Sequence, residues 1–170
     1  MSKFTLPLAA GAVAFALFAP AASAQAALGP DAAACSPGSN RPAVLVSVTG
    51  FKNRAGRLRV QLYGSNPSEF LAKGKKLRRI DLPVSGNGAM NVCVAVPRPG
   101  TYAVAVRHDT DGNNKSGWND GGGFSNNPRI SLVDLKPSLR ETAISVPGGV
   151  KPVQVVLNYR RGLSIGPIGR

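Results

Sequence analysis

Residues 44–48 read VLVSV and residues 58–62 read LRVQL, and in both stretches apolar side chains occupy every second position. This spacing places the apolar side chains on one face of an extended strand. Similar runs recur at residues 77–84, 90–96, 102–108, 142–146 and 153–159. Short alternating runs separated by Gly- and Pro-containing turns predict an all-β fold, an antiparallel sandwich of about seven strands.

The segments between the runs suggest how the strands connect. Residues 53–56 read NRAG, which favours a hairpin turn with Gly56 at positive φ. Residues 66–74 begin with Asn-Pro and end with Gly, which predicts a helix of one or two turns. Residues 109–127 form a long polar loop, and the Gly- and Arg-containing tail, residues 160–170, is expected to fray.

The first 24 residues resemble a secretory signal peptide. Lys3 is followed by an apolar run over residues 4–19, and the Ala-Ser-Ala sequence at residues 22–24 predicts cleavage before Gln25. The alternative is a membrane anchor, but the apolar run is shorter than the roughly 20 residues a span needs. We therefore expect an exported protein without a transmembrane segment in its mature chain, located in the periplasm or secreted.

The mature chain divides into an extended leader (25–42), a sandwich domain (43–159) and the basic tail (160–170). Cys35 in the leader and Cys93 in the fourth run are the two cysteines of the chain. In an oxidising compartment such a pair favours a disulfide, which would stabilise the fold by about 4 kcal/mol. Lipidation of Cys35 is the alternative, but this residue lies well beyond the apolar run.

The chain is strongly basic, with 21 Lys and Arg residues against 8 Asp and Glu and a net charge of +13. Without Lys3 the mature chain keeps 20 − 8 = +12. Such a charge favours anionic partners, which in an envelope are lipopolysaccharide, anionic lipid or acidic glycan. Nucleic acid is not expected, because the basic residues do not alternate with stacking aromatic residues. The candidate anion-binding residues are Arg57, Arg59, Lys75, Lys76, Arg78 and Arg79. The alternative, a merely solvated basic surface, stays open.

Three loop motifs carry a family resemblance. Residues 99–104 read PGTYAV, residues 108–113 read HDTDGN and residues 123–127 read GFSNN. These motifs resemble the DUF2141 family of uncharacterised exported bacterial proteins, and the likeness extends over about residues 43–159. The resemblance implies an immunoglobulin-like or transthyretin-like sandwich, and it implies no known activity. The chain departs from the family pattern after Asn113, where the later acid is shifted in spacing.

Three of the eight acidic residues fall within the polar loop. Their spacing, Asp-x-Asp-x-Asn with a further Asp at position 12, is that of oxygen ligands in a calcium-binding loop. The candidate ligands are Asp109, Asp111, Asn113, the backbone carbonyl of Lys115, and Asp120. Position 6 is Asn114 where glycine is usual, although Asn tolerates positive φ better than most residues. The alternative is ordinary turn chemistry, which Asp-Gly and Asn-Asn sequences also support.

Nothing in the sequence assigns a catalytic residue. There is a single histidine, His108, and we expect it to be structural. No Gly-x-Ser-x-Gly motif is present, and neither cysteine has a plausible histidine partner. Trp118 and Phe124 are expected to fold beneath the polar loop as a small core of its own; the alternative is that they are exposed and contact a ligand. We expect a non-enzymatic binding or structural module; the alternatives are a binder of anionic envelope components and a metal-assisted hydrolase of transthyretin-like type.

Overall fold

The structure of the protein is a computed structural model, and residues 26–168 are described. The predicted signal peptide, residues 1–24, lies outside the described residues. Ten strands and two short helical segments make up the described chain: η1 (Ala32–Cys35), β1 (Ala43–Thr49), β2 (Arg57–Tyr63), β3 (Arg78–Pro83), β4 (Met90–Ala95), β5 (Gly100–Asp109), β6 (Gly121–Phe124), α1 (Leu139–Thr142), β7 (Ala143–Val146), β8 (Val150–Val156), β9 (Asn158–Arg161) and β10 (Ser164–Pro167).

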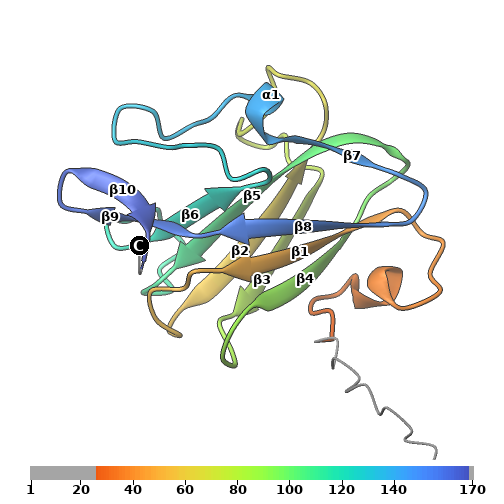
Figure 1. Cartoon of the computed structure of the whole chain (residues 1–170), viewed down its shortest axis with the longest axis horizontal. Coiled ribbons are helices and arrows are strands. Elements are labelled where there is room, and N and C mark those ends of the chain that lie inside the picture. Colours follow the sequence, from red (N-terminus) through yellow and green to blue (C-terminus); the bar gives the residue numbers. More distant parts are fainter. Residues whose placement is uncertain (1–25, 169–170) are drawn as a thin grey trace, which may run out of the picture.

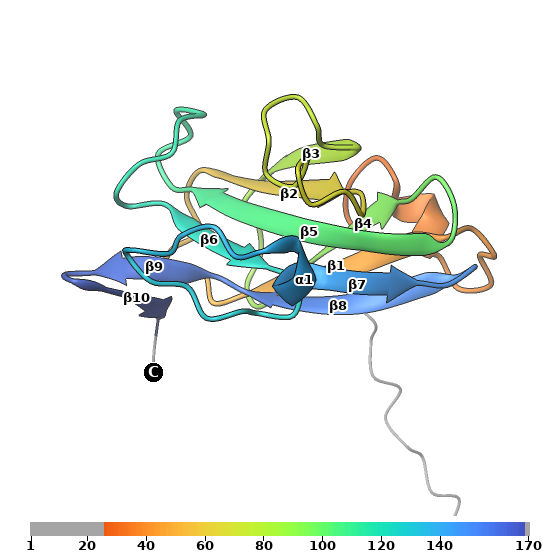
Figure 2. The same cartoon turned by 90° about the horizontal axis from the view of Figure 1, so that it is seen from above.

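The strands form two facing sheets, which confirms the predicted all-β sandwich. The smaller sheet has the order β4-β1-β8, and the larger has the order β10-β9-β6-β5-β2-β3, with β7 added on β5. Figure 1 shows the strands of the small sheet crossing in front of β5, β2 and β3, and Figure 2 shows the two layers from above. The β9–β10 hairpin and the leader lie at opposite ends of the molecule (Figure 1).

The core lies between the two sheets and consists of the alternating side chains that defined the strands. Val44, Val46 and Val48 of β1 are fully buried, and β2 contributes Leu58 and Leu62 in the same way. Tyr102 at the start of β5 is also buried, and its hydroxyl donates a hydrogen bond to the Arg98 carbonyl at 2.7 Å. The period-two pattern is therefore explained by burial of one face of each sheet.

The first two strands do not form the expected hairpin. β1 pairs with β4 and β8, whereas β2 pairs with β3 and β5, so residues 53–56 carry the chain from one sheet to the other. Gly56 has a φ of 73°, as the turn predicted. A turn motif specifies the local reversal but not which strand the next segment will join. The pairing of β1 with β8 is parallel, an exception in an otherwise antiparallel set of named strands.

The strand β6 was hidden inside the predicted polar loop. Its sequence is Gly-Gly-Gly-Phe, and glycine is unfavourable in a strand unless another segment approaches closely. A Cβ atom on Gly121 would collide with the ring of Tyr159, and one on Gly123 would lie 2.7 Å from Val155 Cγ1. The glycines therefore leave room for the segment that runs from β8 to β9 to pass close over β6, as it moves from the small sheet to the large sheet.

The helical segments differ from the prediction. Residues 67–71 form successive turns and no helix, and Leu71 has a φ of 60°, which interrupts any helical run. The short helix α1 was not expected. It is closed by a capping box in which Ser138 accepts from the Glu141 N–H, while the Glu141 carboxylate accepts from the Ser138 N–H at 2.8 Å.

The leader is held on the outer face of the small sheet. Its residues include the 3-10 turn η1, so it is only partly extended. As expected, Cys35 forms a disulfide with Cys93, and the two Cα atoms are 5.9 Å apart. Leu28 extends the pairing beyond β4 through a bridge to Val92. The predicted fraying of the tail was wrong for residues 160–167, because β9 and β10 form a hairpin there.

Candidate functional site

The acidic loop connects β5 to β6, and the register of these strands brings its two ends together. His108 pairs with Gly121, so the next residues outward, Asp109 and Asp120, leave the hairpin side by side. Asp111 follows two residues after Asp109 in the loop. One carboxylate oxygen from each of these three residues lies within 4.8 Å of the others. The sheet therefore gathers three of the eight acidic residues of the chain at one end of β5.

Asp109 is the most enclosed of the three, with 1% of its surface exposed. Its Oδ2 accepts a hydrogen bond from the Asn114 N–H at 2.8 Å and an ion pair from Arg107 Nη2 at 3.3 Å. Its Oδ1 is buried and has no hydrogen-bond partner. Burial favours the neutral acid, but the Asn114 N–H, the Asp111 side chain, the Arg107 guanidinium and the Gly112 N–H together outweigh it and hold the pKa of Asp109 below its usual value. The buried carboxyl is thus an anion with one unsatisfied oxygen.

The other two carboxylates close the loop upon itself. Asp120 accepts the Thr110 N–H on Oδ1 at 3.0 Å and the Gly117 N–H on Oδ2 at 2.9 Å. Asp111 accepts the N–H of Asn113 on Oδ1 at 3.1 Å. Asp120 Oδ1 also accepts the Thr110 hydroxyl at 3.3 Å, whereas Asp120 Oδ2 and Asp111 Oδ1 each retain a lone pair that could bind a cation.

The remaining two candidate ligands act within the loop. Asn113 donates its side-chain amide to Asp111 Oδ2 at 2.6 Å and accepts the Lys115 N–H on its own oxygen at 2.7 Å. Asn114 has a φ of 65°, so it adopts the conformation expected of the residue at position 6. Asn113 and Lys115 therefore shape the turn, while the carboxylates of Asp109, Asp111 and Asp120 converge.

A buried chain of hydrogen bonds holds His108, the neighbour of Asp109 at the end of β5. His108 is fully buried, its Nε2 lies 2.8 Å from the Ala55 carbonyl and its Nδ1 lies 2.6 Å from the Tyr159 hydroxyl. A carbonyl can only accept, so Nε2 carries the proton and the Tyr159 hydroxyl donates to Nδ1. The same hydroxyl accepts the Lys52 N–H at 3.1 Å. Both nitrogens of the histidine are satisfied, and the ring fixes the end of β5.

The basic residues singled out from the sequence are largely engaged with acids. The ion pairs are Arg59–Asp81, Arg79–Asp81, Arg78–Asp31 and Lys75–Glu69. Within residues 26–168, no ion pair is made by Arg57 or Lys76. Four of the six predicted anion-binding residues are therefore neutralised in part by the protein itself, and the Asp31 pair reveals a role for the leader that the sequence did not indicate.

The aromatic residues of the loop region do not form the expected small core together. Trp118 is 74% exposed, and the Arg160 guanidinium stacks on its ring with Cζ 3.5 Å from the ring centroid. Phe124 is partly buried and meets Phe70 edge to face, with the ring centroids 6.4 Å apart. The prediction that Trp118 folds beneath the loop was wrong.

Fold and site together define a small disulfide-bonded β-sandwich protein with an acidic hairpin loop. The family model described as "Uncharacterized protein conserved in bacteria (DUF2141)" matches residues 46–154, and the chain belongs to this family. This confirms the resemblance carried by the loop motifs. No curated protein and no solved structure matches the chain. Along the described residues, no helix has both the length and the apolar character needed to cross a membrane.

Proposed function

We propose that this protein is an exported, non-enzymatic binding or structural module whose β5–β6 loop is stabilised by a calcium ion. The observation that carries the cation is the buried, unpartnered Oδ1 of Asp109. A buried anionic oxygen without a partner costs about 1–3 kcal/mol or more, and a cation held by the three carboxylates would remove this cost. Hard oxygen ligands suit calcium better than softer metals.

The local charge also favours a cation. The three carboxylates, with Arg107 and Lys115 beside them, leave one net negative charge at the loop, in a chain whose overall charge is +13. Turn formation alone, without a cation, accounts for the hydrogen bonds that Asp111 and Asp120 accept from the loop backbone. It leaves the buried Asp109 Oδ1 without a hydrogen-bond partner.

Export and the lack of catalysis rest on other observations. The first 24 residues have the pattern of a signal peptide, and a disulfide between Cys35 and Cys93 fits an oxidising compartment such as the periplasm. The single histidine of the chain is enclosed with both nitrogens bonded, which favours a structural role. These points support a module that binds or scaffolds over a hydrolase.

The test is a thermal melt of the purified protein in millimolar calcium and in chelator. At a calcium concentration 100 times its dissociation constant, a site specific to the folded state adds about 2.7 kcal/mol. Such a gain raises the melting temperature by about 5–10 °C in a domain of this size. Metal analysis of the same preparation should find close to one calcium per chain.

Variants locate the effect. Asp111→Asn removes an exposed carboxylate of the cluster and should abolish the calcium response while leaving the fold intact. Asp134→Asn removes an exposed carboxylate from a different loop and should respond to calcium like the wild type. A melting temperature that does not change between calcium and chelator refutes the cation site, and an equal response in both variants refutes its location.

Anionic envelope components remain the alternative partner, supported by the net charge of +13. With four of the six candidate residues in ion pairs, we expect any such binding to be weak and strongly dependent on salt. Retention on anionic but not neutral liposomes at low salt would support this alternative, and equal retention on both would exclude it.

A further inference from the structure

A cleft lies beside the acidic loop, between residues 116–118, the segment 130–135 and the β9–β10 hairpin. Its volume is about 400 Å³, within the range of small-molecule sites. A second groove of about 490 Å³ adjoins it and shares Ile130, Asn158 and Ile165 with it. The loop and the hairpin lie at the same end of the sandwich (Figure 2).

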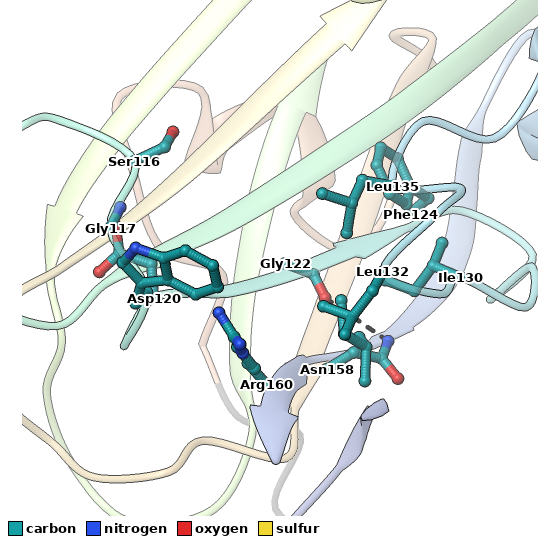
Figure 3. A pocket seen from close by; sticks show the side chains of 12 residues that line it. Ser116, Gly117, Asp120, Gly122, Phe124, Ile130, Leu132, Leu135, Asn158 and Arg160 are labelled. Atoms are coloured by element: carbon teal, nitrogen blue, oxygen red, sulfur yellow. Dashed lines mark hydrogen bonds between the residues drawn. The ribbon is translucent and has the colours of Figure 1, made fainter. Parts of the chain in front are cut away.

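One side of the cleft is aliphatic. Figure 3 shows Leu135, Phe124, Leu132 and Ile130 gathered on one side, with Arg160 across from them. Leu135 is 53% exposed. Large apolar side chains that gather at a hollow on the surface of a small protein mark a binding site more often than isolated ones do.

The other side of the cleft supplies positive charge and an aromatic face. Arg160 donates Nε to the Gly162 carbonyl at 2.9 Å, and its guanidinium rests on the Trp118 ring. The adjoining groove adds Arg129, and no acidic residue lines that groove. The acid in the cleft itself, Asp120, is turned to the Thr110 and Gly117 N–H groups. Arg160 in the cleft and Arg129 in the groove are therefore the cations available to an acidic ligand group.

The polar groups of the cleft are poorly placed for a sugar. Asn158 donates its amide to the Val156 carbonyl at 3.1 Å and to the Gly122 carbonyl at 3.5 Å. The Ser116 hydroxyl accepts from Arg107 Nη1 at 2.9 Å, and both Asp120 oxygens accept loop N–H groups, so the polar side chains of the cleft are largely engaged within the protein. Aliphatic walls with one cationic flank fit a ligand that is apolar along its length and negatively charged at one end.

We propose that this cleft binds a monomeric single-chain anionic amphiphile, with the acyl chain along the Leu132–Leu135 side and the acidic head group paired with Arg160. Burial of each methylene against the aliphatic side stabilises the complex by the hydrophobic effect. The head group replaces water around a guanidinium that is already ordered by Trp118 and the Gly162 carbonyl. The site does not require a cation in the neighbouring loop.

Decanoate, kept below its micelle concentration, is the probe, and decanol is its neutral counterpart. The chain has a single tryptophan, Trp118, so its fluorescence reports directly on the cleft, and calorimetry gives the affinity independently. We expect decanoate to bind about fivefold more tightly than decanol, as one partly exposed ion pair provides. The titration is run in calcium and in chelator; binding in either supports the cleft, and failure in both overturns it, whatever the melting curves show.

Matched variants separate the two halves of the site. Arg160→Gln should weaken decanoate about fivefold and leave decanol unchanged, whereas Leu135→Asn should weaken both. The controls are Arg98→Gln and Leu163→Asn, exposed residues outside the cleft, which should bind like the wild type. The proposal is overturned if decanoate and decanol bind with equal affinity, or if inorganic phosphate alone binds as tightly as decanoate. It is also overturned if the protein is retained on anionic phospholipid vesicles but does not bind decanoate.

Discussion

Replacing Tyr159 with Phe removes one oxygen atom from the centre of the buried hydrogen-bond chain. Tyr159 is 1% exposed, and its hydroxyl both donates to His108 Nδ1 and accepts the Lys52 N–H. The variant keeps the ring and leaves these two groups without a partner. A buried polar group left without a hydrogen-bond partner costs about 1–3 kcal/mol. The Lys52 N–H lies nearer the surface, so its loss should cost less than that of His108 Nδ1. We therefore expect a loss of about 2–3 kcal/mol of unfolding free energy.

Urea unfolding at neutral pH measures this loss, and Tyr102→Phe is the matched control. The Tyr102 hydroxyl donates to a single acceptor, the carbonyl of the exposed residue Arg98, which water can satisfy in the variant. The control should lose about 1 kcal/mol. If Tyr159→Phe is destabilised no more than Tyr102→Phe, the hydrogen-bond chain does not stabilise the end of β5 as we infer.

Alkaline pH provides a second measurement on the same residue. Burial raises the pKa of Tyr159 to about 12, from about 10 in the unfolded chain. The fold requires the neutral phenol, so this contribution is complete below about pH 10 and is lost as the pH rises to about 12. Two pKa units correspond to about 2–3 kcal/mol. The gap between wild type and Tyr159→Phe should therefore shrink above pH 10, and a constant gap would contradict the assignment.

Two further predictions concern β6 and the large sheet. Gly123→Val should destabilise the protein by more than about 2 kcal/mol in thermal melts, because the new side chain would collide with β8. Gly148→Ala is the control and should have little effect, because the space around Gly148 is open. Equal effects of the two substitutions would refute the role of glycine in β6. Burial opposes ionisation of Asp81, but Arg79 and Arg59 hold its pKa below the usual value, so its stabilisation is present above about pH 4 and lost in more acidic solution. The stability difference between wild type and Asp81→Asn should accordingly shrink in urea melts as the pH falls below 4, and a difference that grows would be inconsistent with these ion pairs.

The sequence predicted those elements whose side chains alternate between core and surface. The spacing of the valines in β1 and β4 and of the leucines in β2 indicates one buried face on each strand, and this spacing does not depend on which strands are neighbours. It could not predict β6, because Gly121 and Gly123 are selected by the close passage of β8 and β9 and not by strand propensity. Nor could the NRAG turn show that β1 and β2 belong to different sheets.

The site was predictable in part for the same reason. The spacing of Asp109, Asp111 and Asp120 along the chain is local information, and it was enough to single out the residues that converge. The burial of Asp109 was not visible, because it depends on the register of β5 against β6 and on the packing of residues 53–56 against the end of β5. The contact of Trp118 with Arg160 was not visible either, because Arg160 lies in a hairpin that the sequence did not indicate.

The parallel pairing of β1 with β8 bears on how the chain reaches its native state. Ala43 pairs with Val150 and Thr49 with Val156, so the small sheet stays incomplete until nearly the whole polypeptide is available. Folds built on such distant contacts form slowly, and during that time β1 offers an unpaired, valine-rich edge to other chains. A product of premature termination or proteolysis that ends before Val150 would keep this edge permanently open, and we expect it to aggregate where the full-length chain folds.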